Sequence, residues 1–339
     1  MSRIYFLSAL CISLFAISAC NQGPTILPNV TGKSGEVCIV VEKNIWNGSL
    51  GTALREMLTA PYPALPQIEP SFTLFNIAPS AFSKIFQAHR NLIIINISPE
   101  ITEEKFSIGE NAWARPQIVV NLSAPTVEAA LALLQQKEEI LVSALEQAER
   151  NRVISNAKRY EESTLRMLVN ESFGGSPYFP NGYALLKQSN NKDFIWIAYE
   201  TTYTNQGIFI YSYPYVDSSS LTTSYMIKMR NDILKREVPG PVENSHMITS
   251  PSYNVDMRWV RYAQKDFVEL RGLWEVQNDF MGGPFVSHSI INPKTRDVLV
   301  MEAFVYAPRF DKRSYLRQVE SILYSFEWED KQPVEEDKK

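Results

Sequence analysis

The chain of 339 residues has little cysteine, a near balance of opposite charges and no long apolar run after its first 20 residues. Three cysteines are too few for a disulfide framework. The 33 basic and 37 acidic residues give a formal net charge of −4, whereas nucleic acid binding needs clustered positive charge. No later segment approaches the ~20 apolar residues of a membrane-spanning helix. These shortages exclude a disulfide-rich scaffold and argue against nucleic acid as a partner.

The short motifs of common enzyme classes are also absent from the sequence. It contains no HExxH, CxxC, GxSxG or GxxxxGK[ST]. Two SxxK matches, at residues 155–158 and 189–192, lack the SDN and KTG elements of serine acyl-transferases, so we interpret them as chance matches. The histidines at 89, 246 and 288 are too widely separated for a local metal motif. The sequence therefore predicts no metal and no cofactor.

Residues 1–19 have the features of a lipoprotein signal peptide. Positively charged Arg3 precedes an apolar run at residues 4–17, which is short for a membrane span but fits a secretory signal. The run ends in Ile-Ser-Ala-Cys, a bacterial lipobox in which the Cys20 thiol receives the diacylglycerol and the mature chain carries acyl groups such as palmitate. Lipid on Cys20 would anchor the protein to a membrane without spanning it. The alternative is an ordinary signal peptide with an incidental cysteine.

Residues 20–35 are predicted to be a lipidated tether rich in Pro, Gly and Asn. No acidic cluster follows Cys20, as it commonly does in surface-exposed lipoproteins of the Bacteroidota, and Asn21 is not the Asp of the enterobacterial inner-membrane signal. We therefore expect a cell-envelope protein on the outer membrane that faces the periplasm. Cys38, the one thiol left after processing, lies in an apolar run and is predicted to be a buried small hydrophobe.

Residues 36–124 are predicted to form an α/β region, because strands alternate with short helices. The segment at 91–97 is β-branched and apolar on both faces, which predicts a central strand. The other expected strands are 36–43, 72–77 and 117–122, with helices at 47–58 and 79–89.

Residues 125–175 are predicted to be a long helical connector that ends at Gly174 and Gly175. An apolar stripe follows one face, made of Val127, Leu131, Leu134, Leu141, Leu145 and Ala148. Two interpretations remain open: a coiled-coil seam for a partner, or a bent or broken helix packed on the protein's own sheet. The second is favoured because the stripe drifts after Arg152.

Residues 176–328 are predicted to form a mainly antiparallel sheet with helices packed on one face, followed by a disordered tail at 329–339. The expected strands are 183–187, 194–199, 208–213, 257–263, 267–276, 285–291 and 298–306, and the expected helices are 218–236 and 311–324. The whole chain is thus predicted to be α+β.

Candidate site residues concentrate at 269–285. Strand alternation places Glu269, Arg271, Glu275 and Gln277 on one face and Val268, Leu270, Trp274 and Val276 on the other. The polar face is either a binding face or an ion-pair ladder on a solvated surface. A turn with paired glycines follows, and it either shapes a site or only connects strands. The candidate binding residues are Arg271, Trp274, Asn278, Gly282 and Gly283.

A tight hairpin at residues 292–296 gives a further, checkable prediction. If Asn292 faces Arg296, then His288 and Glu302 share a sheet face as diagonal neighbours, ~7–8 Å apart. A histidine beside a carboxylate can do general acid–base work, although such pairs are more often structural hydrogen bonds. The candidate catalytic residues are His288, Glu302, Glu275 and Asp279.

Two stretches carry a resemblance to a known family. RNLIIINI at 90–97 and the segment at 271–308, together with the lipobox, resemble a Bacteroidota lipoprotein family described as domain of unknown function 4837. The resemblance extends over nearly the whole mature chain. It implies an envelope location and supplies no catalytic roles.

The first functional hypothesis is a non-catalytic, lipid-anchored binding or scaffold protein whose partner is an envelope protein or a small ligand. The motivation is a lipobox followed by a large folded region without a catalytic motif. The alternative is an envelope hydrolase that uses the His/carboxylate residues above. A third possibility is an assembly factor that docks through the long helix. A cleft uniting acids would favour the enzyme, and an aromatic patch without convergent acids would favour binding.

Overall fold

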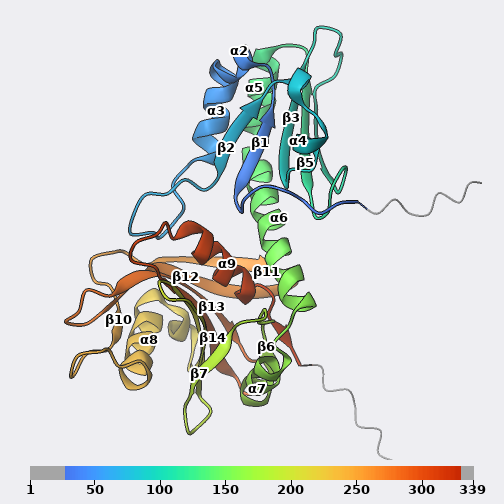
Figure 1. Cartoon of the computed structure of the whole chain (residues 1–339). Helices are drawn as coiled ribbons and strands as arrows, with labels where there is room; N and C mark the ends of the chain where they lie inside the picture. Colours follow the sequence, from blue (N-terminus) through green and yellow to red (C-terminus); the bar gives the residue numbers. More distant parts are fainter. Residues whose placement is uncertain (1–26, 330–339) are drawn as a thin grey trace, which may run out of the picture.

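A computed structural model describes residues 27–329, which form two lobes joined by helices (Figure 1). Cys20 and residues 330–339 lie outside the described residues, so the lipidation and tail predictions are untested. Within 27–329, no helix is both long and apolar enough to cross a bilayer.

The N-terminal lobe contains a five-stranded sheet in the order β2-β1-β3-β5-β4. Its strands are β1 (Glu36–Val40), β2 (Thr73–Ile77), β3 (Asn91–Ile97), β4 (Lys105–Glu110) and β5 (Ile118–Ala124). All neighbours are parallel except β4, which pairs antiparallel with β5. The apolar 91–97 segment is the middle strand, as predicted, while β4 was not predicted because its sequence lacks a clear apolar pattern.

Three helices pack on one face of this sheet, and the larger of the lobe's two apolar clusters lies between them and the strands. The helices are α3 (Ser49–Leu58), α5 (Val127–Gln136) and the first half of α6 (Glu138–Arg159). The short elements α2 (Lys43–Trp46), η1 (Pro79–Ala81) and α4 (Lys84–Gln87) complete the lobe. Cys38 is fully buried on the other face among Val40, Leu92 and Val119. Burial raises the pKa of its thiol to about 12, which agrees with a packing role.

The predicted connector is three helices rather than one. The helical run breaks at Lys137 between α5 and α6, and again at residues 160–162 before α7 (Ser163–Phe173). Gly174, with φ of +72°, caps α7 in the left-handed region. The apolar stripe packs on the protein's own sheet, with Leu141 and Leu145 fully buried, so the broken-helix interpretation is confirmed.

The C-terminal lobe contains an eight-stranded antiparallel sheet in the order β10-β12-β13-β14-β9-β8-β7, with β11 also paired to β12. The strands are β7 (Ala184–Gln188), β8 (Phe194–Glu200), β9 (Asn205–Pro214), β10 (Met247–Thr249), β11 (Asp256–Tyr262), β12 (Lys265–Val276), β13 (Gly282–Ile291) and β14 (Asp297–Tyr306). A separate small pair joins β6 (Gly175–Ser176) to β15 (Glu327–Trp328). The predicted α+β class is confirmed.

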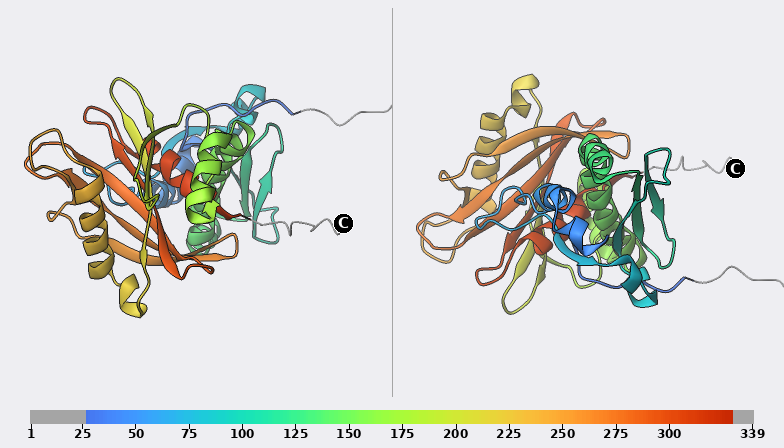
Figure 2. Two further views of the ribbon diagram at one scale, coloured as in Figure 1. Left: turned by 90° about the horizontal axis from the view of Figure 1, so that it is seen from below. Right: turned by 90° about the horizontal axis from the view of Figure 1, so that it is seen from above.

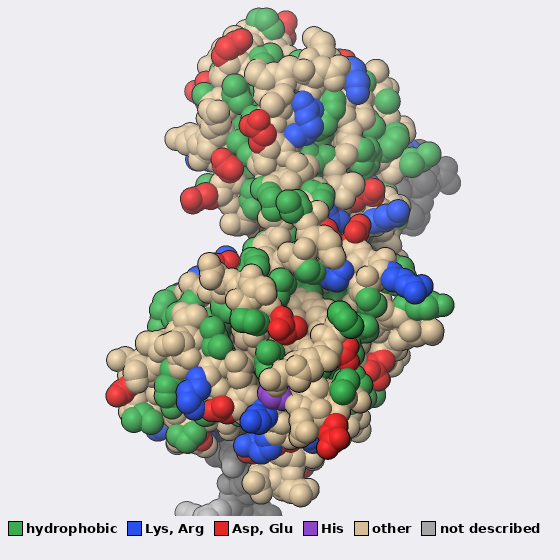
Figure 3. Space-filling view, turned by 90° about the vertical axis from the view of Figure 1, so that its left-hand side faces the viewer, with side chains coloured by type: hydrophobic (Ala, Val, Ile, Leu, Met, Phe, Trp, Pro, Cys, Tyr) green, Lys and Arg blue, Asp and Glu red, His purple; other side chains and the backbone are tan. Residues whose placement is uncertain are grey.

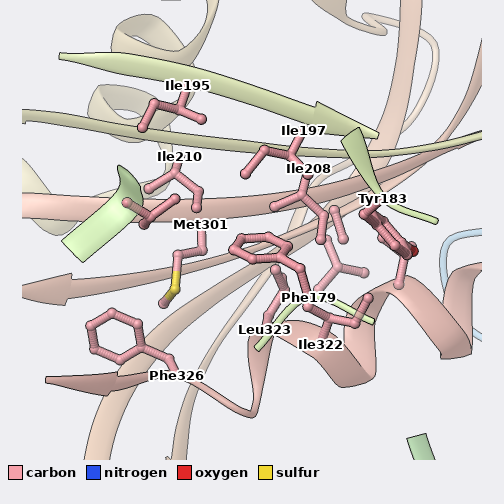
Figure 4. Packing of buried hydrophobic residues seen from close by; sticks show 14 of the residues in the cluster. Phe179, Tyr183, Ile195, Ile197, Ile208, Ile210, Met301, Ile322, Leu323 and Phe326 are labelled. Carbon is pink, nitrogen blue, oxygen red and sulfur yellow. The ribbon is translucent and has the colours of Figure 1, made fainter. Parts of the chain in front are cut away.

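Helices cover both faces of this sheet, whereas the sequence predicted one. Helices α7 and α9 (Arg313–Leu323) pack on one face, and α8 (Thr223–Glu237), preceded by η2 (Ser218–Leu221), packs on the other (Figures 1 and 2). Figure 4 shows the α9 face, where Ile195, Ile197, Ile208 and Ile210 meet Leu323. The strands are apolar on both sides and therefore need two covering layers.

The two lobes meet along α6 and α9, at a waist visible in Figure 3. Helix α6 is ~33 Å long and carries Leu145 into the N-terminal core and Val153 against the C-terminal one. Glu69, from the N-terminal lobe, accepts hydrogen bonds from the backbone N–H groups of Lys312 (2.6 Å) and Arg313 (2.8 Å) at the start of α9. A carboxylate at a helix N-terminus is stabilising, so one lobe caps a helix of the other.

Candidate functional site

The predicted proximity of His288 and Glu302 is wrong. Glu302 pairs across β13–β14 with Ser287, and His288 pairs with Met301. The two side chains therefore point to opposite faces of the sheet. His288 lies under α9, and Glu302 lies under α8.

The error comes from one residue in the hairpin. The loop is closed by Asn292 and Asp297 rather than by Asn292 and Arg296. Arg296 adopts φ of +67° within the loop, and the Asn292 side chain accepts from the backbone N–H of Lys294 at 2.9 Å. Because side chains alternate along a strand, a register change of one residue moves every later side chain to the other face.

His288 is fully buried and belongs to a network of polar side chains. Its Nε2 lies 3.1 Å from Glu269 Oε2, which also accepts from the Tyr324 hydroxyl at 3.2 Å. The other Glu269 oxygen accepts from Arg271 and Arg258, each at 2.7 Å. Glu269 and His288 are both fully buried, so neither group is open to a substrate in this structure.

The Glu269 carboxylate is held ionised by this network. Burial alone would raise its pKa, but the His288 hydrogen bond and the Arg271 charge reverse the effect and place the pKa far below its ordinary value of 4.5. Arg271 continues the network to Glu320 on α9, whose second oxygen accepts from the Tyr62 hydroxyl at 2.9 Å. The expected solvated ladder at Glu269 and Arg271 is therefore a buried chain of ion pairs that reaches the N-terminal lobe.

Glu302 forms a separate ion pair on the other face. Its two oxygens accept from Arg230 Nε at 2.8 Å and Nη2 at 2.7 Å. Arg230 is 1% exposed, and its remaining Nη1 donates to Thr249 at 3.0 Å. This bidentate pair anchors α8 to the sheet and leaves no free carboxylate for acid–base chemistry.

The other candidate acids do not join these groups. Glu275 accepts from the Ser250 hydroxyl at 2.6 Å. Asp279 lies in the exposed turn after β12, beside the fully exposed Phe280. Among the described residues, no hydrogen bond links Glu275 or Asp279 to His288 or Glu302.

The candidate binding residues are likewise dispersed. Trp274 is buried in the α8-side core, as strand alternation predicted. Asn278 adopts φ of +63° in the turn. Gly283 lies where an added Cβ would stand 2.0 Å from the Val305 carbonyl oxygen, and Gly282 where it would stand 2.9 Å from that of Trp274. These glycines permit close strand packing.

The structure instead presents a groove that the sequence did not reveal, which we call the aromatic groove. It is a hollow of about 490 Å³, a size typical of small-molecule sites. It lies beside α9, at the end of the β8–β9 hairpin, and its lining includes Tyr183, Tyr199, Tyr203, Gln206, Phe310 and Tyr315. Tyr203 and Phe310 are 64% and 43% exposed, with ring centroids 6.3 Å apart.

Two buried polar groups of the aromatic groove have no hydrogen-bond partner among the described residues. They are the Tyr183 hydroxyl and the Gln206 side-chain oxygen, in residues that are 6% and 2% exposed. In Figure 4 the Tyr183 hydroxyl points away from Ile197 and Ile208. Burial raises the pKa of Tyr183, so the phenol is neutral and able to donate. Buried polar groups without partners are costly, and a ligand can satisfy them.

A second hollow of about 360 Å³, here called the arginine end, adjoins the aromatic groove and shares four of its lining residues. The shared residues are Asn156, Pro180, Tyr315 and Gln318, and three arginines complete one wall, namely Arg90, Arg152 and Arg317. Burial lowers the pKa of Arg152 to about 10, despite its partner Glu149. The three arginines of this end pair with two carboxylates, Glu149 and Glu146.

No sequence motif could have identified this groove. Its lining comes from α6, the β8–β9 hairpin and α9, which are far apart in the chain. One local signal existed: the Tyr-rich hairpin at 199–205 exposes Tyr203, which has no core position to fill. The described residues contain no group of three or more His, Cys, Asp and Glu placed to hold a metal ion.

The family comparison divides the chain in two. Residues 162–325 match a family described as a domain of unknown function (DUF4837), which confirms that part of the resemblance. Residues 30–158 match a different family, also a domain of unknown function (DUF8532), so the predicted extent over nearly the whole chain is corrected. The two matches meet at the break between α6 and α7.

Solved structures give distant neighbours. The Ran-binding protein Mog1p of Saccharomyces cerevisiae is 10% identical, with a TM-score of 0.31, covering 46% of this chain and 90% of that one. LpqN of Mycobacterium tuberculosis, described as involved in cell envelope biogenesis, is 12% identical, with a TM-score of 0.27 over 44% and 78%. CyanoP of Synechocystis sp. PCC 6803 is 13% identical, with a TM-score of 0.30 over 46% and 87%. The comparison with curated proteins found no match.

Proposed function

We propose that this protein is a lipid-anchored, non-catalytic binding protein of the cell envelope, held on the outer membrane and facing the periplasm. Its aromatic groove binds a ligand, and the acyl groups on Cys20 keep that groove close to the membrane. The observation that carries the binding role is the hollow lined by exposed aromatic rings and unpartnered buried polar groups.

The arrangement of acids supports binding rather than hydrolysis. His288 is fully buried, and Glu302 lies on the opposite face in a bidentate pair with Arg230. The lining of the aromatic groove contains no Asp or Glu. No observation favours the hydrolase alternative, and the assembly-factor alternative loses its motivation because the apolar stripe of the long helices is packed internally.

The anchor sets the reach of the folded body. Residues 29–31, expected to belong to the tether, are already fixed to the N-terminal lobe through bridges from Asn29 to Arg115 and from Thr31 to His89. From Cys20 to Asn29 the chain spans at most ~30 Å. The lobe that matches DUF8532 therefore stays next to the lipid surface in this proposal.

Lipidation is tested by growing cells with an alkyne analogue of palmitate. The wild-type chain is expected to carry the label and to fractionate with membranes, and Cys20→Ala to do neither. Cys38→Ala is the matched control, because it removes the buried cysteine and keeps the label. A Cys20→Ala chain that is still processed and still sediments with membranes would overturn the anchor.

The binding role is tested by photo-crosslinking in intact cells. A benzophenone amino acid replaces Tyr203, and Trp259 on β11 provides the control because both side chains are 64% exposed. We expect a discrete crosslinked species at position 203 only. Equal crosslinking at the two positions, or none at position 203, would reject the groove as a binding site.

A further inference from the structure

The aromatic groove and the arginine end form one continuous lining with two chemical characters. The four shared residues connect a wall of three guanidinium groups to a wall of tyrosine and phenylalanine rings. Neither lining includes an Asp or Glu side chain. A ligand that fills both parts therefore needs a negative group at one end and ring-like apolar faces at the other.

The positive charge of the arginine end exceeds that of its internal partners. Arg90 and Arg152 share Glu149, whose oxygens lie 2.9 Å from each, and Arg317 pairs with Glu146 at 2.6 Å. The charge of nearby Arg313 is offset by Glu69 and Asp311, so the excess of one cation comes from Arg90, Arg152 and Arg317. Among the described residues, Arg90 Nε and Arg317 Nη1 have no hydrogen-bond partner, but both atoms are buried, and Arg317 Nη1 lies against Gly35. The attraction for an anion at this end therefore comes from the net charge of the guanidinium groups and not from these two donors.

The aromatic part is suited to hydroxyl-bearing rings. Tyr199, Tyr203 and Phe310 expose ring surface, and such a surface can stack against the C–H faces of a sugar ring. The two unpartnered groups are a phenol at Tyr183 and a carboxamide at Gln206. A ligand hydroxyl can donate to Gln206 Oε1, and it can donate to or accept from the Tyr183 hydroxyl.

We propose that the groove binds an acidic saccharide, with sugar rings on Tyr199, Tyr203 and Phe310 and the anionic group against Arg90, whose Nη1 has only a long 3.5 Å contact with the Gly32 carbonyl oxygen. This rests on the proposed binding function and adds the chemical class of the ligand. The anion is a carboxylate, as in a uronic acid, or a phosphate ester on a sugar, and both share a negative charge on a hydroxyl-bearing ring. An acidic peptide is less suited, because its side chains bring no hydroxyl-bearing ring to the Tyr183 and Gln206 groups.

Binding is measured by interferometry on the full-length lipidated protein in detergent micelles at low salt. The probes are trigalacturonic acid, its neutral methyl ester, a phosphorylated maltotriose and a triglutamate peptide. We expect at least one acidic sugar to bind, and the ester to bind at least ~10-fold more weakly than the acid, equivalent to ~1.4 kcal/mol. Whichever acidic sugar binds identifies the anion.

Variants assign the binding to the two ends of the groove. Arg90→Gln should weaken the acidic sugar at least ~10-fold, equivalent to ~1.4 kcal/mol, and leave the ester unchanged. Arg261→Gln is the control at a cation that is 73% exposed on β11. Tyr203→Ala should weaken both sugars, while Trp259→Ala should weaken neither. If Arg90→Gln does not fold, the comparison of Tyr203→Ala with Trp259→Ala and the comparison of the acid with its ester still decide the result.

Several outcomes would overturn the saccharide proposal. These are equal binding of acid and ester, tighter binding of triglutamate than of either acidic sugar, or no binding of any sugar. The crosslinking experiment distinguishes failure of the saccharide proposal from failure of the groove as a binding site. A crosslink at position 203 without sugar binding rejects the ligand class alone, whereas absence of the crosslink rejects the groove itself.

Discussion

The two faces of the C-terminal sheet carry buried charge in different ways. Under α8, Arg230 and Glu302 form one bidentate pair that ends locally at Thr249. Under α9, Glu269 and Arg271 begin a chain of contacts that continues through Glu320 to Tyr62 of the N-terminal lobe. The same strands, by alternation, supply both faces.

The difference shows what each face is for. The ion pair on the α8 face makes no hydrogen bond to the N-terminal lobe among the described residues, so its role is to hold α8 on the sheet. The α9 face is shared between lobes, and the aromatic groove opens at its edge beside Tyr315. Polar links across a lobe boundary are directional, and they fix the relative placement of the walls that a groove requires.

The largest effect is expected on the α8 face. Glu302→Ala leaves the buried Arg230 guanidinium without its anion and should lower the free energy of unfolding by about 3–5 kcal/mol. Urea unfolding followed by circular dichroism measures this loss. Asp232→Ala is the control on the same helix, since the Lys228–Asp232 pair is exposed and worth under ~1 kcal/mol. A loss below ~1 kcal/mol for Glu302→Ala would contradict a structural role for the pair.

On the α9 face we expect a smaller loss of free energy of unfolding, together with an effect on the N-terminal lobe. Glu320→Ala removes one partner of Arg271 and the acceptor of Tyr62, but Arg271 retains Glu269, so we expect a loss of about 1–3 kcal/mol. Hydrogen exchange should accelerate in the N-terminal loop at residues 60–70. Exchange in that loop should not respond to Glu302→Ala at matched folded fraction. If both variants accelerate it equally, the two faces do not differ as described.

The α9 network should also make stability depend on pH. The pKa of Glu269 is lower in the folded protein than its ordinary value of 4.5, so the unfolded chain binds the proton more readily. The stabilisation is therefore complete above the unfolded pKa and is lost as the pH falls below it, by about 1.4 kcal/mol per pH unit. Glu269→Gln should remove this part of the slope in urea titrations between about pH 3 and pH 5.

A control separates this carboxylate from the general acid sensitivity of the protein. Glu139→Gln, at an exposed position of α6, should keep the wild-type slope. An unchanged slope in Glu269→Gln would mean that the network does not hold Glu269 ionised.

The smallest stability effect is expected at the rim of the groove. Tyr203→Ala and Trp259→Ala each remove a side chain that is 64% exposed, and both should change the free energy of unfolding by no more than ~0.5 kcal/mol. Only Tyr203→Ala should change ligand capture. A large loss of stability for Tyr203→Ala alone would assign this residue to folding rather than to binding.

Local patterns predicted the fold class and several particular elements. The β-branched 91–97 segment identified the central strand, and Gly174 marked the end of the helical connector. Alternation along residues 268–276 separated Trp274 from Arg271 without error. These features depend on residue type and periodicity over short stretches, which the sequence displays directly.

Pairing across a hairpin was not predictable in the same way. A loop closed by Asp297 instead of Arg296 differs by one residue, yet it separates His288 from Glu302 by the full thickness of the sheet. The additional loop residue is accommodated because Arg296 adopts a positive φ. Arginine rarely adopts this conformation, so the sequence does not predict it. The breaks in the helical connector at Lys137 and at residues 160–162 were similarly set by packing on two lobes.

The sequence by itself determined the alternation of apolar and polar side chains and the α+β class, and its Ile-Ser-Ala-Cys segment is the basis for predicting a lipobox at Cys20. Tertiary structure decided which charges became buried pairs, which face of the sheet each helix covered, and where Tyr183, Tyr203 and Arg90 came together. The reason is physical. Periodicity depends on residues that are close together in the chain, whereas a groove is formed by distant segments whose contact depends on the register and packing of the elements between them.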